Sequence, residues 1–255
     1  MRATIDILRV RFDNISRSEA EVKIRESLTE IKHMSIFTPN PTMVIRAHSS
    51  EELTALLNSA ELSVADGIGI LLASKILGTP LPERIAGIEL GETILSIANE
   101  MRLKIFLIGG KAGVAEKAAE NIRQKYPEMT VCGTHHGYFD KGGAENAAVV
   151  SKIKEASPNV LFVCFGFPAQ ELWIAQNRSA LPSVNICAGL GGSIDVWAGD
   201  IRRAPRVVRT IGLEWLWRMM LQPKRAKDIV CIVRFLLCVF RQKIQMAGHF
   251  RGKKA

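Results

Sequence analysis

Short apolar runs alternate with amphipathic segments along the first 200 residues of the chain. The apolar runs predict strands at residues 4–12, 34–37, around 64, 104–110, 129–135, 159–167 and 183–192. The amphipathic segments predict helices at residues 16–31, 49–60, 113–125 and 144–156. Strands that are apolar throughout, each followed by a helix, are typical of a parallel sheet covered on both faces. The pattern therefore predicts an α/β fold with a Rossmann-like parallel sheet and helices on both faces.

Polar and glycine residues collect where the predicted strands end. These ends carry T-P-N, A-D-G, G-G-K, T-H-H-G-Y, G-F-P-A-Q-E and G-L-G-G-S. Ligands of doubly wound sheets bind outside the carboxyl ends of the strands, so we expect a cleft there. Asp66, in S-V-A-D-G-I-G-I, lies on this rim. From the residues alone it is a helix cap, a ligand anchor or a catalytic base.

The composition is typical of a folded cytosolic protein. Of 255 residues, 47% are apolar and 23% are charged, which excludes a disordered chain. The five cysteines form no C-x-x-C pair, so we expect them to be reduced core residues. In the first ten residues apolar and polar positions alternate and charged residues occur throughout, so we expect no secretory signal.

The last fifth of the chain differs from the rest in charge and in pattern. The net charge is +9, and residues 202–255 hold about 14 Lys and Arg against 2 Asp and Glu. A basic, tryptophan-rich stretch precedes an apolar run of about 12 residues, which is too short for the hydrocarbon core of a bilayer. We therefore expect a core at residues 1–200 and, at 201–255, a basic helical appendage that lies on a membrane surface. Self-association through residues 229–247 is the alternative.

The remaining motifs are individually unspecific. G-G-K-A-G is a strand-to-helix turn that could hold a phosphate, but it is neither a P-loop nor a full G-x-G-x-x-G. Thr38 and Asn40 could form a turn around a proline, and Arg84 could be a surface residue. The two adjacent histidines have no spaced metal-ligating partner, and D-x-D is absent, so we expect no metal site.

Three other classes of function fit less well. A nucleotide-dependent oxidoreductase needs a full dinucleotide fingerprint, which the sequence lacks. A nucleic-acid-binding protein would use the basic tail, but I-V-C-I-V-R-F-L-L-C-V-F suits lipid better than a phosphate backbone, so we expect no nucleic-acid partner. An inactive binding subunit has no need of Asp66, Thr38 and Arg84 together.

The motifs become specific when they are taken together and in order. They are T-P-N-P, A-D-G-I-G-I, P-E-R-I-A-G, F-L-I-G-G, G-Y-F, F-G-F-P-A-Q-E-L-W-I, G-G-S-I-D-V-W-A-G, R-R-A-P and G-L-E-W-L-W-R-M-M-L-Q-P-K-R. This series resembles the WecG/TagA/CpsF family of bacterial glycosyltransferases, which is glycosyltransferase family 26 and of the GT-E type. The resemblance covers the chain from about the first strand to Arg225.

The resemblance implies an inverting, metal-independent hexosyltransferase without a cofactor. Its donor would be a UDP-sugar and its acceptor a polyprenyl-diphosphate-linked N-acetylglucosamine. The enzyme would act peripherally on the inner face of the bacterial cell membrane, in teichoic acid or cell-surface polysaccharide synthesis. N-acetylmannosamine is the expected sugar, and its uronic acid or another hexose such as glucose, in capsule synthesis, is the alternative. The sequence leaves open the donor sugar, the acceptor lipid and the oligomeric state.

The same resemblance implies roles for individual residues. Asp66 matches the proposed catalytic base, and Thr38 an active-site residue of the T-P-N loop. Arg84 matches a cleft arginine near the transferred sugar or its diphosphate. The implied substrate-binding residues are Asn40 in the T-P-N loop, Gly109, Gly110, Tyr138, Gln170 and Asp195 at the donor site, and Arg218 and Arg225 in the appendage, which closes over the site at the membrane.

The implied chemistry agrees with these residue types. Inverting transfer is one in-line displacement at the anomeric carbon, and the acceptor hydroxyl loses its proton to one base, for which Asp66 is placed. The departing UDP gains charge on its diphosphate. Without a metal, guanidinium groups and helix N-termini have to stabilise that charge. If the appendage arginines arrive only when the tail docks, the enzyme is poorly active away from a membrane.

Overall fold

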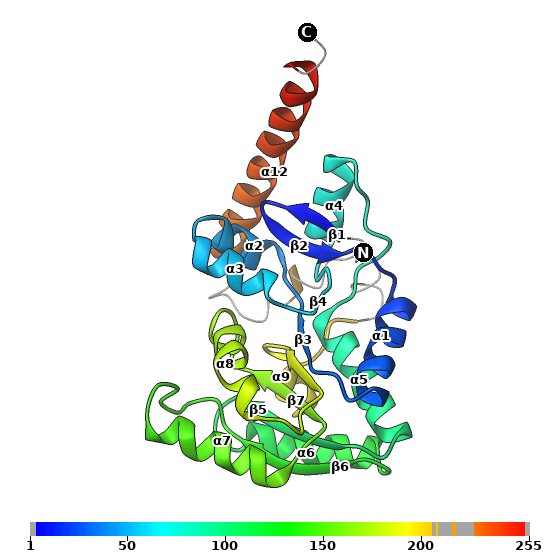
Figure 1. Cartoon of the computed structure of the whole chain (residues 1–255), viewed down its shortest axis with the longest axis vertical. Helices are drawn as coiled ribbons and strands as arrows, with labels where there is room; N and C mark the ends of the chain where they lie inside the picture. The colour runs from blue at the N-terminus through cyan, green and yellow to red at the C-terminus, as the bar shows by residue number, and fades with distance from the viewer. Residues whose placement is uncertain (1–3, 206–207, 209–215, 218–226, 253–255) are drawn as a thin grey trace.

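The computed structural model describes residues 4–205, 208, 216–217 and 227–252 (Figure 1). Its centre is a sheet of six parallel strands in the order β4-β3-β8-β7-β5-β6. The strands are β3 (Met34–Phe37), β4 (Leu62–Ser63), β5 (Lys104–Gly109), β6 (Thr130–His135), β7 (Val160–Cys164) and β8 (Ile186–Gly189). This arrangement confirms the predicted α/β fold with a Rossmann-like parallel sheet.

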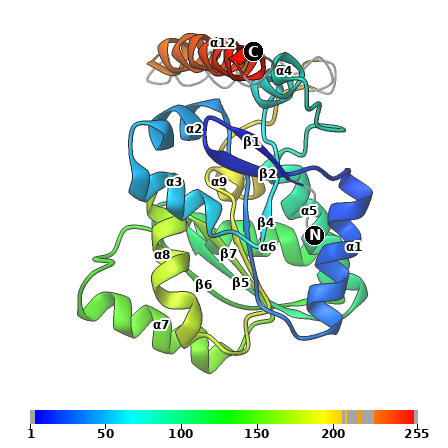
Figure 2. The same ribbon diagram turned by 45° about the horizontal axis from the view of Figure 1, so that its top comes forward.

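Helices cover both faces of the sheet, as predicted (Figure 1, Figure 2). One face is covered by α1 (Arg17–Thr29), α5 (Gly87–Glu100), α6 (Val114–Lys125) and α9 (Ser193–Trp197). The core on the other side involves α2 (Pro41–His48), α3 (Glu51–Asn58), α7 (Ala144–Ala156) and α8 (Ala169–Asn177), while α4 (Ile68–Leu77) joins the same core from beyond the sheet. A short 3-10 helix, Arg178–Ala180, follows α8.

Each face of the sheet has its own hydrophobic core. In β7, Leu161 and Val163 join one core and Phe162 joins the other, and all five residues of the strand are buried. A strand that is buried on both sides has no polar face, which explains why its sequence does not alternate. All five cysteines are free. Cys164 and Cys187 are buried in these cores as predicted, whereas Cys132, Cys231 and Cys238 are only half-buried, so the predicted core position holds for two of the five.

The first predicted strand is wrong. Residues 4–12 do not form one strand of the sheet; the segment folds into a separate antiparallel hairpin, β1 (Thr4–Ile7) and β2 (Val10–Asp13). Leu8 and Arg9 between them have φ values of 50° and 72°. Two successive left-handed residues make the tight turn that matches the twist of paired strands. Neither residue is a glycine or an asparagine, so the sequence carries no turn signal there.

Local capping explains where several helices begin. Ser16 and Glu19 form a complete capping box at the start of α1, and Ser50 caps α3, so the predicted helices at 16–31 and 49–60 are confirmed. The helices α2, α4 and α5 begin directly after the polar loops at the sheet edge. These helices hold the loops in place from one side, while the strands hold them from the other.

The last described helix, α12 (Lys227–Gly252), packs across α2 and α4 (Figure 2). Phe235 and Val239 are fully buried and belong to the core of that face. Lys243 Nζ donates to the carbonyl of Leu77 at 3.1 Å, and Gln242 Oε1 accepts from the N–H of Leu8 at 3.0 Å. Among the helices that the structure describes, none is long and apolar enough to cross a bilayer. The division of the chain at residue 200 stays a prediction.

Candidate active site

Thr38 and Asp66 lie together at the carboxyl ends of the neighbouring strands β3 and β4. The start of α5 runs beside them. The N–H of Ile85 donates to the carbonyl of Ala65 at 3.0 Å, and the N–H of Gly87 donates to Asp66 Oδ2 at 3.4 Å. A Cβ on Gly87 would lie 2.9 Å from Thr38 Oγ1 and 3.7 Å from Asp66 Oδ2. The glycine therefore allows the helix to begin against both side chains.

Asp66 does not cap the helix that follows it in sequence. The N-cap of α4 is Gly67, which has no side-chain capping bond. The carboxylate instead faces the first N–H of α5, a helix of 14 residues. The N-terminus of a helix carries partial positive charge. Half-buried Asp66 thus lies where the fold stabilises negative charge, beside a hydroxyl group.

Asn40 and Arg84 flank this pair. Asn40 caps α2, because its Oδ1 accepts from the N–H of Met43 at 3.1 Å, and Pro41 takes the first helical position. Arg84 is not a surface residue: only 15% of its side chain is exposed, and its Nη2 lies 3.8 Å from Glu89 Oε1. The structure therefore brings four predicted site residues to one corner of the sheet edge.

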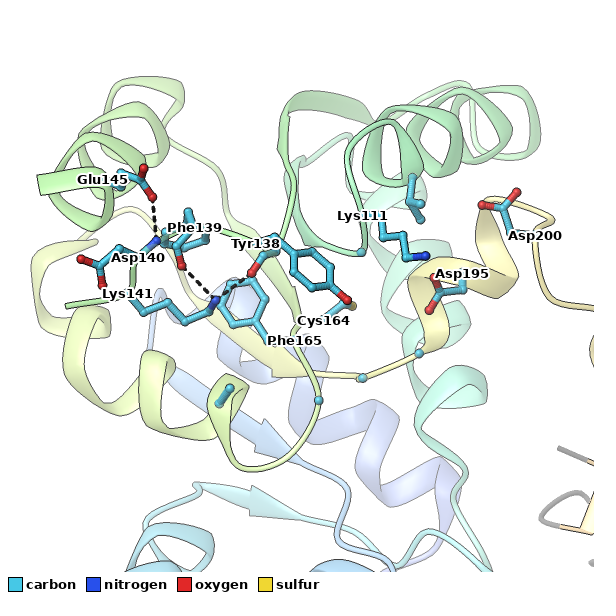
Figure 3. A pocket seen from close by; sticks show the side chains of 17 residues that line it. Lys111, Tyr138, Phe139, Asp140, Lys141, Glu145, Cys164, Phe165, Asp195 and Asp200 are labelled. Atoms are coloured by element: carbon cyan, nitrogen blue, oxygen red, sulfur yellow. Dashed lines mark hydrogen bonds between the residues drawn. The ribbon is translucent and has the colours of Figure 1, made fainter. Parts of the chain in front are cut away.

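A cavity of about 820 Å³ opens at the carboxyl ends of β5 to β8 (Figure 3). Three predicted donor-site residues line it: Gly110, Tyr138 and Asp195. Gly109 ends β5 directly before the cavity. Both positively and negatively charged side chains line the cavity. They are Lys111, Lys141, Asp140, Glu145, Asp195 and Asp200.

The turn from β5 into α6 requires glycine. Gly110 has a φ of 67°, and a Cβ there would lie 2.7 Å from Val114 Cγ1. Gly110, Lys111 and Val114 all line the cavity, so the N-terminus of α6 borders it. Helix N-termini with exposed N–H groups bind phosphate. This wall of the cavity is suited to an anion.

Lys141 holds the loop that follows β6. Its Nζ donates to the carbonyls of Gly137 at 2.7 Å and Phe139 at 3.4 Å. The ammonium also lies 4.5 Å from the ring centroid of Phe139 and 4.4 Å from that of Phe165. Burial lowers the pKa of Lys141, and Asp140 partly opposes this effect.

Tyr138 projects from the loop that Lys141 holds. It is 73% exposed, and Figure 3 shows it pointing across the cavity toward the side of Lys111 and Asp195. An exposed aromatic face next to a turn that is suited to an anion is itself suited to a nucleobase.

Gln170 lies behind the cavity and is buried. Its Oε1 accepts from the N–H of Gly166 at 3.1 Å and from that of Gly191 at 2.9 Å, and both glycines line the cavity. Its Nε2 donates to Glu171 Oε1 at 2.8 Å. Gln170 therefore sets the spacing of two cavity walls. Its predicted role at the donor site stays a prediction.

Glu171 is completely buried beside Gln170. Burial raises the pKa of Glu171 to about 7, against the opposing effects of the Gln170 hydrogen bond and the positive charge of Arg46. Within the described residues its Oε2 has no hydrogen-bond partner. The carboxyl group is thus close to half-protonated at neutral pH, in direct contact with the residue that spaces the cavity walls.

One helix connects the cavity to the Thr38–Asp66 pair. The N-terminus of α5 lies against Asp66, and further along a Cβ on Gly91 would be 2.7 Å from Trp197 of α9. The helix α9 carries Asp195 to the cavity. The strands β3 and β8 are also direct neighbours in the sheet. Both groups of residues therefore belong to one edge of the sheet.

Two predicted site residues, Arg218 and Arg225, lie outside the described residues. Within the part of the chain that is described, no group of three or more His, Cys, Asp or Glu side chains could hold a metal ion. Metal independence stays a prediction.

Comparison with known proteins identifies the family. The sequence model of the glycosyl transferase WecG/TagA/CpsF family matches residues 5–248. The chain belongs to this family. This glycosyltransferase is 36% identical over 243 residues to an N-acetylglucosaminyldiphosphoundecaprenol N-acetyl-beta-D-mannosaminyltransferase of Staphylococcus aureus strain NCTC 8325, and the alignment covers 94% of each chain. The protein of the same name from strain MRSA252 is 35% identical, with the same coverage. Membership makes the chain a hexosyltransferase.

Sequence reasoning missed several residues around the site of this glycosyltransferase. Lys111 lies inside G-G-K-A-G and Lys141 follows G-Y-F after one residue, so their motifs could have indicated both. Glu171 adjoins Gln170 in A-Q-E, but the motif does not reveal that it is buried. The surroundings of Glu89 are not visible from the sequence, because its partners come from distant segments.

We expect Glu171→Gln to change how stability depends on pH. The folded-state pKa of Glu171, about 7, lies above its usual value, 4.5. Between these values the folded state binds more protons than the unfolded state, so this group makes the wild type less stable as the pH rises. The glutamine of the variant mimics the neutral carboxyl group, so the variant does not lose stability in this way as the pH rises. From about pH 4 to about pH 8 its stability relative to wild type should rise by up to about 3 kcal/mol.

Urea unfolding across that pH range measures the difference. Glu120→Gln, on the exposed side of α6, is the matched control and should follow the wild type. A difference between Glu171→Gln and wild type that stays constant with pH would contradict the prediction.

Proposed function

We propose that the protein transfers N-acetylmannosamine from its UDP derivative to a polyprenyl-diphosphate-linked N-acetylglucosamine, with inversion and without a metal. The staphylococcal relatives are N-acetylmannosaminyltransferases by name, and the similarity extends over nearly the whole chain. The observation that carries the proposal is that Thr38 and Asp66 lie on the same sheet edge as a cavity suited to a nucleotide. Transfer of its uronic acid or of another hexose, such as glucose, is the alternative.

The groups around the cavity match the parts of a uridine diphosphate. The glycine turn and the N-terminus of α6 offer N–H donors to the phosphates, with Lys111 beside them. Tyr138 offers a ring for the base to stack on. Asp195 and Asp200 offer acceptors for the ribose hydroxyls. With carboxylates outnumbering lysines around the cavity, backbone N–H groups have to provide most of the phosphate binding.

In the proposed mechanism the hydroxyl oxygen of the acceptor attacks the anomeric carbon of the donor sugar, and Asp66 takes the proton of that hydroxyl. The bond between the anomeric carbon and the diphosphate oxygen of the donor breaks, and UDP leaves with the electron pair. Thr38 lies beside Asp66 and orients the acceptor. Arg84, Arg218 and Arg225 stabilise the charge that develops on the diphosphate. Gln170 and Gly109 contribute by shaping the cavity.

The first test is transfer from a panel of UDP-sugars to the lipid-linked N-acetylglucosamine, in the presence of a chelator. We expect one donor to be used, with kcat about 10²- to 10⁴-fold lower in Asp66→Asn, because the amide cannot accept the proton. The matched control is Asp6→Asn, on the exposed side of β1, which should keep full activity. No transfer from any donor would contradict the proposed reaction. Wild-type turnover by Asp66→Asn would contradict the role of the base.

A second test concerns the donor site. Tyr138→Ala should weaken UDP binding about 5- to 150-fold, because stacking on an aromatic ring contributes about 1–3 kcal/mol per base. Tyr138→Phe keeps the ring and should bind UDP like the wild type. Isothermal titration calorimetry with UDP distinguishes them. Equal affinities for all three proteins would mean that the base binds elsewhere.

We also propose that α12 docks the protein on a membrane surface. Its inner side is buried on α2 and α4, and its outer side carries an apolar stripe. The residues of this stripe follow one another at intervals of three and four positions, and their side chains are 51% to 70% exposed. They are Val230, Val233, Leu237, Phe240 and Ile244. Exposed Arg234 and Arg241 lie on the same helix, where they could bind anionic headgroups.

The position of α12 favours this partner. The helices beneath it, α2 and α4, begin at the T-P-N and A-D-G loops that carry Thr38 and Asp66. Docking through the outer stripe would hold these loops near the bilayer, where the diphosphate of a lipid-linked acceptor lies.

Flotation with vesicles that contain anionic lipid tests the docking. The double variant Leu237→Gln, Phe240→Gln should bind about 10- to 100-fold more weakly, because it removes two apolar side chains from the interface. Val22→Gln, at an equally exposed site on α1, is the control and should bind normally. Unchanged flotation of the double variant would contradict the proposal. A shift to a smaller oligomer in size-exclusion chromatography would assign the stripe to self-association instead.

A further inference from the structure

Glu89 gathers three arginines next to the proposed base. It lies in the first turn of α5, the helix whose N-terminus faces Asp66. Its Oε2 accepts from Arg17 Nη2 at 2.6 Å. Its Oε1 accepts from Arg203 Nη2 at 2.7 Å and lies 3.8 Å from Arg84 Nη2. The three arginines come from the N-terminal helix, the loop before α5 and the stretch after α9.

Most of this cluster is shielded from water. The exposed fractions of the side chains are 15% for Glu89, 15% for Arg84 and 18% for Arg203. Salt screens such ion pairs less than surface pairs. Removing the Glu89 carboxylate takes away the negative charge that these three arginines share. Losing one partner of a buried ion pair is far more disruptive than breaking an exposed pair.

The distances indicate what the carboxylate does. Arg17 and Arg203 bind it at hydrogen-bond distance from two sides, so its position is fixed. Arg84 lies farther away, at a distance where attraction orients a guanidinium without a close hydrogen bond. The carboxylate is therefore a fixed negative charge against which Arg84 is oriented.

Arg203 extends the connection to the C-terminal part of the chain. It belongs to R-R-A-P, and its Nη1 also lies 3.4 Å from Oε2 of Glu92, one turn further along α5. Ala204 next to it is buried. The basic C-terminal stretch begins here, so the ion pairs of Arg203 fix its starting point relative to α5.

We propose that Glu89 is a positioning residue for sugar transfer. It orients the Arg84 guanidinium beside the base, and it fastens Arg203, and with it the start of the C-terminal stretch, to the N-terminal turns of α5. The proposal rests on the proposed function, since the role of Arg84 in transfer belongs to that function.

Kinetics of the full-length protein test the orienting role. Glu89→Gln keeps the shape and removes the charge, and kcat should fall about 10- to 100-fold, as expected for a misplaced active-site group. The dissociation constant for UDP should rise by a smaller factor than kcat falls, because most of the groups that would hold UDP line the cavity away from Arg84. Glu89→Asp should recover part of kcat. Glu92→Gln is the matched control, on the same side of α5, and should stay within about threefold of wild type.

Coupling to Arg84 separates orientation from a purely structural effect. In an Arg84→Met background Glu89→Gln should lower kcat little further, because it acts through the missing guanidinium. Three outcomes would overturn the orienting role. The first is that the losses in kcat from the two substitutions are additive, and the second is that Glu89→Gln keeps the wild-type kcat. The third is that its kcat falls together with an equal loss of UDP affinity and a lower melting temperature.

Limited proteolysis tests the fastening role without any activity measurement. Trypsin should cut native Glu89→Gln after Arg203 at least about fivefold faster than wild type, as read by mass spectrometry, because the released segment opens more often. Glu92→Gln should be cut at an intermediate rate. Equal rates in Glu89→Gln and wild type would overturn the fastening role. If the wild type transfers no sugar at all, the proposed function fails, and the cleavage rates still decide whether Glu89 holds Arg203.

Discussion

The parallel direction of the six central strands is the constraint on which the other features depend. Parallel neighbours need helical crossovers, and the crossovers cover both faces of the sheet. The edge at the carboxyl ends of the strands is then left to polar loops. Thr38, Asp66 and Gly110 come from three different loops and Asp195 from the first turn of α9, and all four lie on this one edge. Their proximity therefore follows from strand direction.

The helix α5 sets the distance between the Thr38–Asp66 corner and the cavity along this edge. Its N-terminus lies against Asp66, its first turn carries Glu89, and its middle packs on α9 at Gly91. Because a helix is rigid over this length, the corner with the proposed base and the cavity with Asp195 keep a constant separation. Two glycines, at positions 87 and 91, allow these close approaches, since a Cβ at either would collide with a neighbouring side chain.

The helix α12 relates the outer surface of the molecule to the same edge. It is buried through Phe235 and Val239 on the helices that start at Asn40 and Gly67. Under the proposed function, the helix that meets the lipid packs on the two helices whose preceding loops carry Thr38 and Asp66, the residues that act on the lipid-linked sugar. An enzyme with a donor from the aqueous phase and an acceptor in a bilayer needs a site that is open to both.

The sequence by itself determined the strands of the sheet, their parallel direction and the loops that would carry chemistry. Unalternating apolar runs that end in glycine and polar residues encode these features locally. The tertiary structure alone decided that residues 4–12 form a hairpin outside the sheet, that Gln170 lies behind the cavity, and that Glu89 joins residues 72 and 114 positions away. Periodicity records which face of an element is buried. It does not record which distant residue lies against it, and these features depend on such long-range contacts.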